Sequence, residues 1–334
     1  MMSFNVVTIY DNRRWDRFVR NAHMSDFNHS WHYHSTAADG EPLLLVYEEQ
    51  NEFIALPVIR KSEGETNGVR QYSLHSYAGP LCSTNFALLN SGMQERFERM
   101  FRLFMEQHTI ISVSVQLHPL IHKNFKPISL GVLRKNPESM LIQITPGTGM
   151  QPEHYGEDFG NRLSLLQRKG YTVRQALAIH DVDAFGEIFR RNLGALNQQA
   201  AAHYDKAWFR QMLRPGGFDA CLLLAGQGMQ TAAGALLTCC NDLMKLHIAA
   251  THENFLFDAP LRVLLHEAVM LGQKTGMQHL LLEGLAGRPE ILYACKAYGP
   301  ELYPGFDTWQ ISSGKTDYGD SKARKLRQPL SVAV

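Results

Sequence analysis

Two local motifs of the sequence resemble ligand-binding motifs, and each lacks a residue that its chemistry requires. Gly314-Lys315-Thr316 matches the end of a phosphate-binding loop, but Trp309 stands where that loop needs its first glycine. His266-Glu267 could begin a zinc-protease helix with two imidazoles on one face, but Met270 occupies the second histidine position. We therefore exclude both motifs and expect His266 to belong to an ordinary core or surface helix.

Three histidines stand close together near the start of the chain, at His29, His32 and His34. On a strand, His32 and His34 would point to the same side, as two metal ligands must. No matching set of cysteine, aspartate or glutamate residues sits nearby, so we expect no metal site. The sequence instead predicts an aromatic, partly exposed segment here.

The chain contains five cysteines, too few and too irregularly spaced for a disulfide framework or a paired zinc motif. The adjacent pair Cys239-Cys240 falls in a predicted strand, where its two thiols would face opposite sides of a sheet. We expect buried free thiols that pack, as in a reducing compartment.

Composition indicates a folded protein whose overall charge does not favour nucleic acid, so that any such contact would be local. Hydrophobic residues make up 45% of the 334 residues and charged residues 19%, close to the values of globular proteins. The formal net charge is +1, so no overall field favours DNA or an anionic membrane as the partner. No signal peptide and no apolar run long enough to span a bilayer is visible. We expect a cytoplasmic protein of about two domains.

Hydrophobic periodicity predicts the same order of elements twice: helix, hairpin, strand, amphipathic helix, strand. In the first half the predicted ranges are 10–22, 43–47 with 53–59, 72–77, 93–105 and 110–117. In the second half they are 180–195, 220–224 with 232–238, 243–250, 258–273 and 279–282. We expect Asp258 to cap the last of these helices and Gly276 to end it. The repeated order predicts an α/β (α+β) protein built from two similar units.

This order, together with several short segments, resembles the tandem GNAT-like acyltransferases of the FemAB type and the related CelD-like proteins of exopolysaccharide synthesis. The element near the end of the second half, 293–299 (Tyr-Ala-Cys-Lys-Ala-Tyr-Gly), resembles the family's aromatic-x-Lys-x-aromatic-Gly element. The other matching segments are 15–18, 27–31, 77–81, 189–192, 204–209 and 260–272. Together these segments cover roughly residues 10–305.

The resemblance implies two tandem GNAT-like domains, each with a mixed central sheet flanked by helices. It divides the chain into a degenerate, acceptor-binding domain at 1–145, a linker at 146–170, an acyl-transfer domain at 171–312 and a flexible basic tail at 313–334. It implies transfer of an acyl or aminoacyl group to an amino or hydroxyl group of a glycan or peptidoglycan-type precursor. The donor would be an acyl-CoA or an aminoacyl-tRNA. A peripheral contact with inner-membrane biosynthetic machinery is compatible with this activity.

The same resemblance proposes site residues. Lys296 would stabilise the tetrahedral oxyanion, although a solvated lysine is the alternative. Tyr298 would donate a proton to the leaving group or simply pack, and Glu283 would be a general base or an ordinary charged strand end. Arg190 and Arg191 would bind phosphate or lie on an exposed helix face. Substrate contacts are also expected from three aromatic residues: Trp31, Tyr77 and Tyr293.

One departure bears on the donor. CoA-dependent GNAT enzymes place a glycine-rich loop before the helix that holds the pyrophosphate, whereas residues 253–260 (Glu-Asn-Phe-Leu-Phe-Asp-Ala-Pro) contain no glycine and end in a proline. This disfavours acetyl-CoA bound in the usual way. The stretch 162–169 is also less basic than the family's linker, which weighs against a tRNA donor. A non-catalytic tandem GNAT module that binds a glycan or protein, and an acyl-CoA-dependent N-acetyltransferase, remain alternatives.

Overall fold

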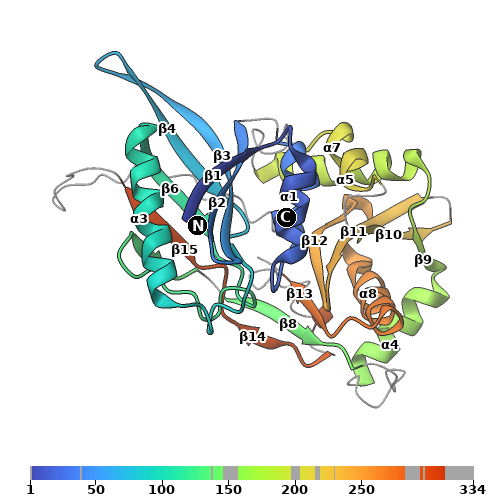
Figure 1. Ribbon diagram of the computed structural model, residues 1–334. Coiled ribbons are helices and arrows are strands. Elements are labelled where there is room, and N and C mark those ends of the chain that lie inside the picture. The colour runs from blue at the N-terminus through green and yellow to red at the C-terminus, as the bar shows by residue number, and fades with distance from the viewer. Residues whose placement is uncertain are drawn as a thin grey trace. The chain divides into compact units, whose positions relative to one another are not determined.

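The structure is a computed structural model, and it describes residues 2–37, 40–136, 138–145, 157–196, 204–214, 219–228, 230–282, 294–295 and 298–312. The chain divides into two compact units, each with its own sheet (Figure 1). Of the described residues, 2–136 and 304–312 form the first unit, and those between 138 and 303 form the second.

The first unit is a sheet with the strand order β1-β2-β3-β4-β6-β15-β7, in which β5 also pairs with β3. Its strands are β1 (Met2–Thr8), β2 (Glu41–Glu49), β3 (Glu52–Thr66), β4 (Val69–Ser76), β5 (Leu81–Cys82), β6 (Ile110–Gln116), β7 (Val132–Arg134) and β15 (Thr308–Ser312). Its helices are α1 (Asn12–Asn21), the 3₁₀ helix η1 (Phe27–His29), α2 (Trp31–Ser35) and α3 (Ser91–Gln107). The β3–β4 hairpin extends beyond the rest of this sheet (Figure 1).

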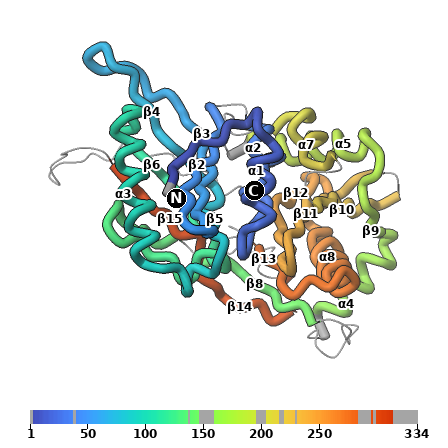
Figure 2. The backbone as a smooth tube through the Cα atoms, viewed as in Figure 1, coloured from blue at the N-terminus to red at the C-terminus, as the bar shows by residue number. Residues whose placement is uncertain are grey.

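The second unit is a sheet with the strand order β14-β8-β13-β12-β11-β10-β9. Its strands are β8 (Ser139–Gln143), β9 (Tyr171–Gln175), β10 (Asp219–Gln227), β11 (Gln230–Cys240), β12 (Leu243–Thr251), β13 (His279–Leu282) and β14 (Glu301–Tyr303). Its helices are α4 (Glu157–Arg168), α5 (Ile179–Leu196), α7 (Lys206–Met212), the 3₁₀ helix η3 (Glu253–Asp258) and α8 (Leu261–Thr275). Figure 2 follows the same path as a backbone tube.

Among the described strands, each unit has one parallel pair joined by a helix, and the other pairs are antiparallel. In the first unit β4, α3 and β6 form this crossover, and in the second unit β12, α8 and β13 do so. The repeated order of elements predicted from the sequence is therefore confirmed. The expectation of mixed sheets flanked by helices is confirmed as well.

The two sheets exchange strands in a symmetrical way. β7 lies at the edge of the first sheet, while β8, the next strand in the sequence, pairs with β13 of the second. Likewise β14 lies at the edge of the second sheet, while the following β15 pairs with β6 of the first. Each crossover strand, β6 or β13, thus has its antiparallel neighbour supplied from the other half of the sequence.

This exchange places two strands on the other side of the boundaries expected from the sequence. β8 falls within the first expected domain, 1–145, but pairs in the second sheet, and β15 falls within the second, 171–312, but pairs in the first. The expected linker, 146–170, contains α4. Hydrophobic periodicity identifies a strand but not its pairing partner, so a sequence interval alone cannot reveal such an exchange. The expected tail, 313–334, lies outside the described residues.

The central strands of the first sheet are buried on both faces. Leu43, Leu45 and Tyr47 of β2 belong to the cluster under α3, whereas Leu44 and Val46 pack with α1. This two-sided burial explains why the sequence shows a continuous apolar run rather than alternation at this strand. The predicted stripe of α3 is buried in the same cluster, through its members Met93, Phe97, Phe101, Phe104 and Met105.

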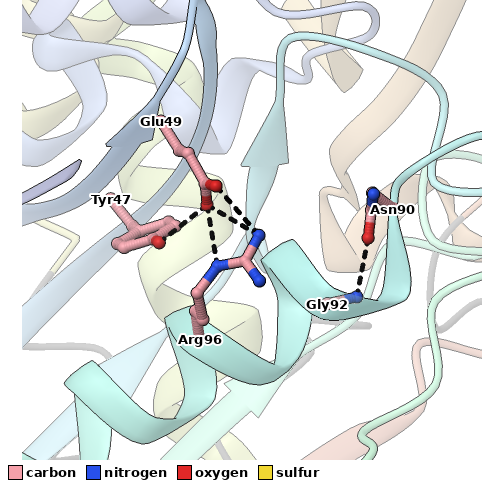
Figure 3. Close-up of polar contacts among 5 residues, drawn as sticks. All are labelled: Tyr47, Glu49, Asn90, Gly92 and Arg96. Carbon is pink, nitrogen blue, oxygen red and sulfur yellow. Dashed lines mark hydrogen bonds and ion pairs between the residues drawn. The ribbon is translucent and has the colours of Figure 1, made fainter. Parts of the chain in front are cut away.

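A polar contact fastens α3 to the end of β2 (Figure 3). Arg96 of α3 donates from Nε and Nη2 to the two carboxylate oxygens of Glu49, at 2.9 Å each, and the Tyr47 hydroxyl donates to the same carboxylate at 2.9 Å. The guanidinium holds the pKa of Glu49 below its usual range, so the pair stays ionised in neutral solution. Asn90 caps the helix by accepting from the Gly92 N–H at 2.8 Å.

The histidine-rich segment differs from its expected form. It is helical rather than extended, and His29, His32 and His34 are buried, with exposed fractions of 0%, 6% and 1%. Each of two rings is held by backbone: His34 Nε2 lies 3.0 Å from the Asn28 carbonyl, and the Asp26 N–H donates to His29 Nδ1 at 2.9 Å. The histidines serve this unit as hydrogen-bonding core residues, a role that residue type alone does not reveal.

The exchanged strand β15 generates a first prediction. Trp309 is fully buried in the first unit, donates to the Leu130 carbonyl at 2.6 Å and packs against Phe101 and Phe125. We expect Trp309→Ala to lower the free energy of unfolding by about 3–5 kcal/mol, because it leaves a cavity and an unpaired carbonyl. Hydrogen exchange should show lost amide protection in 97–134 and retained protection in 219–251.

The matched variant is Trp208→Ala, in α7 of the second unit, which should give the reverse pattern. Loss of protection in 219–251 on changing Trp309, with 97–134 intact, would contradict the assignment of β15 to the first sheet.

The buried histidines generate a second prediction. Burial lowers the pKa of His34 and of His122 to about 3, against about 6.5 in an unfolded chain. Between pH 6.5 and 3 the unfolded state therefore binds protons at these histidines that the folded state does not bind. The free energy of unfolding is unaffected by them above pH 6.5 and decreases as the pH falls from 6.5 toward 3. Each histidine should contribute a slope of about 1.4 kcal/mol per pH unit in this window.

Urea unfolding of the protein between pH 7 and pH 4 measures this slope. His122→Gln should reduce the slope, and the same change at the exposed His108 should leave it as it is. Equal slopes in the two variants would rule out His122 as one of the titrating groups.

Candidate active site

The second unit has an irregularity in the strand that precedes its crossover helix. On β12, Leu246 pairs with Leu237 of β11 and Ile248 pairs with Leu236, so His247 is the extra residue of a β-bulge. The ring of His247 stacks on Trp208 of α7, with centroids 6.4 Å apart. Pairing with β13 covers only Leu243–Leu246, so the described β13 accompanies just the first part of β12. Bulges at such positions redirect a strand and are frequent beside active sites.

Helix α5 holds the far end of β12. The Asn192 side-chain amide donates to the carbonyl of Thr251, the last residue of the strand, at 3.0 Å. Phe185 and Phe189 of the same helix are fully buried and pack edge-on to Phe209 of α7. The described end of β12 is thereby fixed from the α5 side.

On the other face of this sheet, Tyr298 and His266 form a polar pair within an apolar cluster. The Tyr298 hydroxyl lies 3.1 Å from His266 Nδ1 of α8, and Phe159 of α4 packs edge-on to the tyrosine ring. Tyr298 is only 8% exposed. Burial lowers the pKa of His266, and the neighbouring carboxylate of Glu267 partly opposes this shift. His266 is therefore neutral at pH 7.

A hydroxyl held against a neutral imidazole can transfer a proton in either direction. With Nδ1 bare, the imidazole accepts the tyrosine proton, and the phenol oxygen can then receive a proton from another group. With Nδ1 protonated, the imidazole donates to the phenol oxygen and leaves the hydroxyl to donate elsewhere. Tyr298 thus combines a hydrogen bond to a titratable side chain with packing in the core.

A small apolar gap lies in the same layer, between β11, β12 and α8. It encloses about 10 Å³ and is lined by Ala235, Leu246, Ala249, Leu261, Leu264, Leu265, Ala268 and Ala294. Such a space is about the size of one water molecule, and its lining offers no polar partner. The described residues therefore hold no preformed acyl pocket at this point.

The start of α8 differs from its predicted form. Asp258 does not cap the helix: its carboxylate accepts from Lys169 Nζ at 2.5 Å and from the Tyr171 hydroxyl at 2.7 Å. Pro260 occupies the N-cap position without a side-chain cap bond, and Ala259 is left-handed with φ of 51°. Lys169 and Tyr171 compete successfully for the carboxylate because they offer a charge-assisted contact. The predicted end of the helix at Gly276, also left-handed, is confirmed.

The two predicted phosphate-binding arginines lie on α5. Arg190 and Arg191 both contact Glu187, one turn earlier on the same helix, with Arg191 Nε at 3.2 Å from the carboxylate. Arg190 is half-buried and Arg191 exposed. A shared carboxylate partner reduces the charge that they offer to a phosphate.

Two predicted substrate-binding aromatics lie in the first unit. The Trp31 indole donates to the Ile9 carbonyl at 2.6 Å, which fixes the start of α2. The Tyr77 carbonyl accepts from the Asn28 amide at 3.1 Å, and its ring lies 6.5 Å from that of Tyr33. The segment carrying Trp31 and the turn carrying Tyr77 are thus joined through the fold.

The remaining predicted residues, Lys296, Glu283 and Tyr293, lie outside the described residues. Ala294, Cys295 and Tyr298 of the same stretch are described and belong to the cluster packed against α8.

Sequence reasoning missed His266 and His247. In the sequence His266 belongs to an incomplete zinc motif, and the signal that could have identified it is its place beside the apolar stripe of the predicted helix. The bulge at His247 leaves no trace in hydrophobic periodicity, since both flanking residues are apolar.

The described part of the chain contains no group of three metal-ligating side chains. Within that same part, no helix combines the length and apolarity needed to cross a bilayer.

No protein-family model matches the chain, and no curated protein matches it in sequence. Solved structures do match. FemX superposes with a TM-score of 0.64 at 10% identity, covering 93% of this chain and 97% of FemX. A tandem GNAT protein from the clavulanic acid biosynthesis pathway superposes with a TM-score of 0.55 at 10% identity, covering 95% of this chain and 100% of that protein. L-PGS from Bacillus licheniformis gives 0.52 at 8% identity, over 90% and 91%.

These likenesses extend over nearly the whole chain and include both sheets, although few residues are shared. The chain therefore has the tandem GNAT fold that it shares with FemX.

Proposed function

We propose that the protein is an acyltransferase of the tandem GNAT type. It would transfer an acyl or aminoacyl group to an amino or hydroxyl group of a cell-envelope or exopolysaccharide precursor. The observation that carries the proposal is the contact between Tyr298 and the neutral His266, in the second unit and on the helix of its crossover. The tandem GNAT fold supports the reaction class, and the family resemblance of the sequence supports the acceptor class.

The proposed reaction needs a route for one proton. The nucleophile attacks the acyl carbonyl, a new C–N or C–O bond forms, and the bond to the thiol or to the tRNA hydroxyl breaks. The phenol oxygen of Tyr298 takes the nucleophile's proton while its own proton moves to His266 Nδ1. The reverse movement returns a proton to the leaving group, so the pair ends in its initial state.

The residues expected from the resemblance complete this proposal. Lys296 would stabilise the oxyanion, and Glu283 would be an alternative base. Arg190 and Arg191 would release Glu187 and contact a phosphate in its place. Substrate contacts are proposed for the three expected aromatic residues: Trp31, Tyr77 and Tyr293.

The start of α8 bears on the donor. Pro260 at the N-cap offers no N–H to a pyrophosphate, and the Asp258 carboxylate just before it, although paired with Lys169, adds a negative charge, so both weigh against a pyrophosphate at the first turn. An acyl-CoA would therefore have to bind in another way than in CoA-dependent GNAT enzymes. An activity assay should therefore offer the protein both aminoacyl-tRNA and acyl-CoA as donors.

Tyr298→Phe tests the proposal directly. Once a donor is found, this change should lower kcat by about 100-fold or more with KM little changed, because it removes a proton-transfer group but keeps the ring packing. Tyr303→Phe, in edge strand β14, is the matched control and should keep full activity.

Turnover by Tyr298→Phe at the rate of the unchanged protein would refute the proton route. Binding of a glycan or protein without turnover of any donor would refute the enzyme and favour the non-catalytic module.

The pH dependence gives an independent check. Activity requires neutral His266, whose pKa lies below 6.5, so the acidic limb of the kcat profile should fall below pH 6.5. Glu267 raises this pKa, so Glu267→Gln should move the limb to still lower pH. A limb that moves upward or stays fixed in this variant would show that another group controls it.

A further inference from the structure

A cavity of about 170 Å³ lies within the first unit. Its lining comes from the segment after α1, the segment after β5 and the loop after β6. The lining residues are His23, Met24, Cys82, Thr84, Asn85, Phe86, Leu120, Ile121, Lys123 and Asn124. β6 is the second strand of the parallel pair of this sheet, and the loop that follows it supplies Leu120, Ile121, Lys123 and Asn124 of the lining. Open α/β sheets bind ligands beyond the carboxyl ends of such strands.

Buried hydrogen bonds fix the walls of this cavity. The His23 N–H donates to the Cys82 carbonyl at 2.8 Å, and His122 Nε2 lies 2.7 Å from the Pro80 carbonyl, to which it donates. The Phe86 ring packs on His122 with centroids 5.5 Å apart. At Gly79, with φ of 75°, an added Cβ would lie 2.5 Å from the His122 ring, so only glycine fits.

The loop after β6 is also anchored from α3. The buried Glu98 carboxylate accepts from the backbone N–H groups of Ile128 and Ser129, at 2.9 and 2.7 Å, and from the Gln94 amide at 3.0 Å. The cavity is therefore preformed and does not depend on a ligand to order its walls.

The chemistry of the lining is cationic and partly apolar. Lys123 is exposed and has no ion-pair partner within the described part of the chain, and no carboxylate is among the lining residues. Burial raises the pKa of the Cys82 thiol to about 11, so the thiol adds no negative charge to the lining. Hydroxyl and amide groups of Thr84 and Asn124 add hydrogen-bonding capacity. Apolar surface comes from Met24, Phe86, Leu120 and Ile121.

A single unpaired cation beside an apolar wall complements a small anion with an apolar body. The volume is below the ~300–1,000 Å³ of pockets for drug-sized ligands, so the ligand must be compact. We propose that this cavity binds a small carboxylate whose apolar body packs on Phe86 and Ile121 and whose charge is held by Lys123. This proposal does not rest on the proposed transferase activity.

Titration of the full chain with benzoate, followed by backbone amide NMR, tests the proposal. Saturable shifts should appear at residues 82–86 and 120–124. Lys123→Gln should weaken binding about tenfold, the size of one charge-assisted contact. Lys126→Gln, an exposed lysine of the same loop that does not line the cavity, should change it less than about twofold.

Two further ligands separate the parts of the proposal. Benzamide, of the same shape without the charge, should bind at least about tenfold more weakly than benzoate. Inorganic phosphate, which has charge without an apolar body, should also bind more weakly. Equal affinity for benzamide or for phosphate would overturn the proposal, and so would equal effects of the two lysine variants or an absence of saturable shifts.

Discussion

Both units depend on one constraint: the second edge of each crossover strand, β6 or β13, must pair with another strand. Each strand is the second member of a parallel crossover, and each would expose a row of unsatisfied N–H and C=O groups if its other edge were left open. β15 closes the edge of β6, and β8 closes that of β13. Each closing strand comes from the other half of the sequence. Neither half could therefore complete its sheet alone.

Buried polar contacts then set the details that the apolar core leaves open. The clusters under α3 and α8 consist of aliphatic and aromatic side chains, which fix helices on sheets without directional preference. Directional hydrogen bonds orient the loops. The Glu98 carboxylate of α3 accepts from a loop N–H, and His122 of the loop after β6 bonds the Pro80 carbonyl. In the second unit the pair of Tyr298 and His266 occupies a comparable position within the core. The same kind of contact thus serves architecture in one unit and is proposed to serve chemistry in the other.

The sequence predicted the elements with strong periodicity and missed those with little of it. α3 and α8, the hairpins and β13 were predicted because their apolar positions repeat at 3.6 or lie in short β-branched and leucine runs. Short strands such as β7 and β14 carry almost no pattern, and their places depend on partners distant in the sequence. Asp258 satisfied every local rule for a cap, but Lys169 and Tyr171 compete for it through tertiary contacts.

The candidate site was predictable only in part, for related reasons. Tyr298 was identified through a family pattern, whereas its partner His266 lies 32 residues earlier and is brought to it by the packing of α8. The cavity beside Lys123 combines three separate segments, each of which is an unremarkable loop by itself. Both proposals therefore depend on contacts between distant segments, which residue types and local patterns do not reveal.

The exchanged strand also has a consequence for synthesis on the ribosome. Trp309 and its carbonyl partner Leu130 are 179 residues apart, so at about 5–20 residues per second β6 waits roughly 10–35 s for β15 to be made. During that interval β9 to β13 can join β8, which has already emerged, and edge strand β14 completes their sheet just before β15 is made. The domain encoded first is therefore the one completed last, and its open edge is the surface that a nascent-chain chaperone would have to shield.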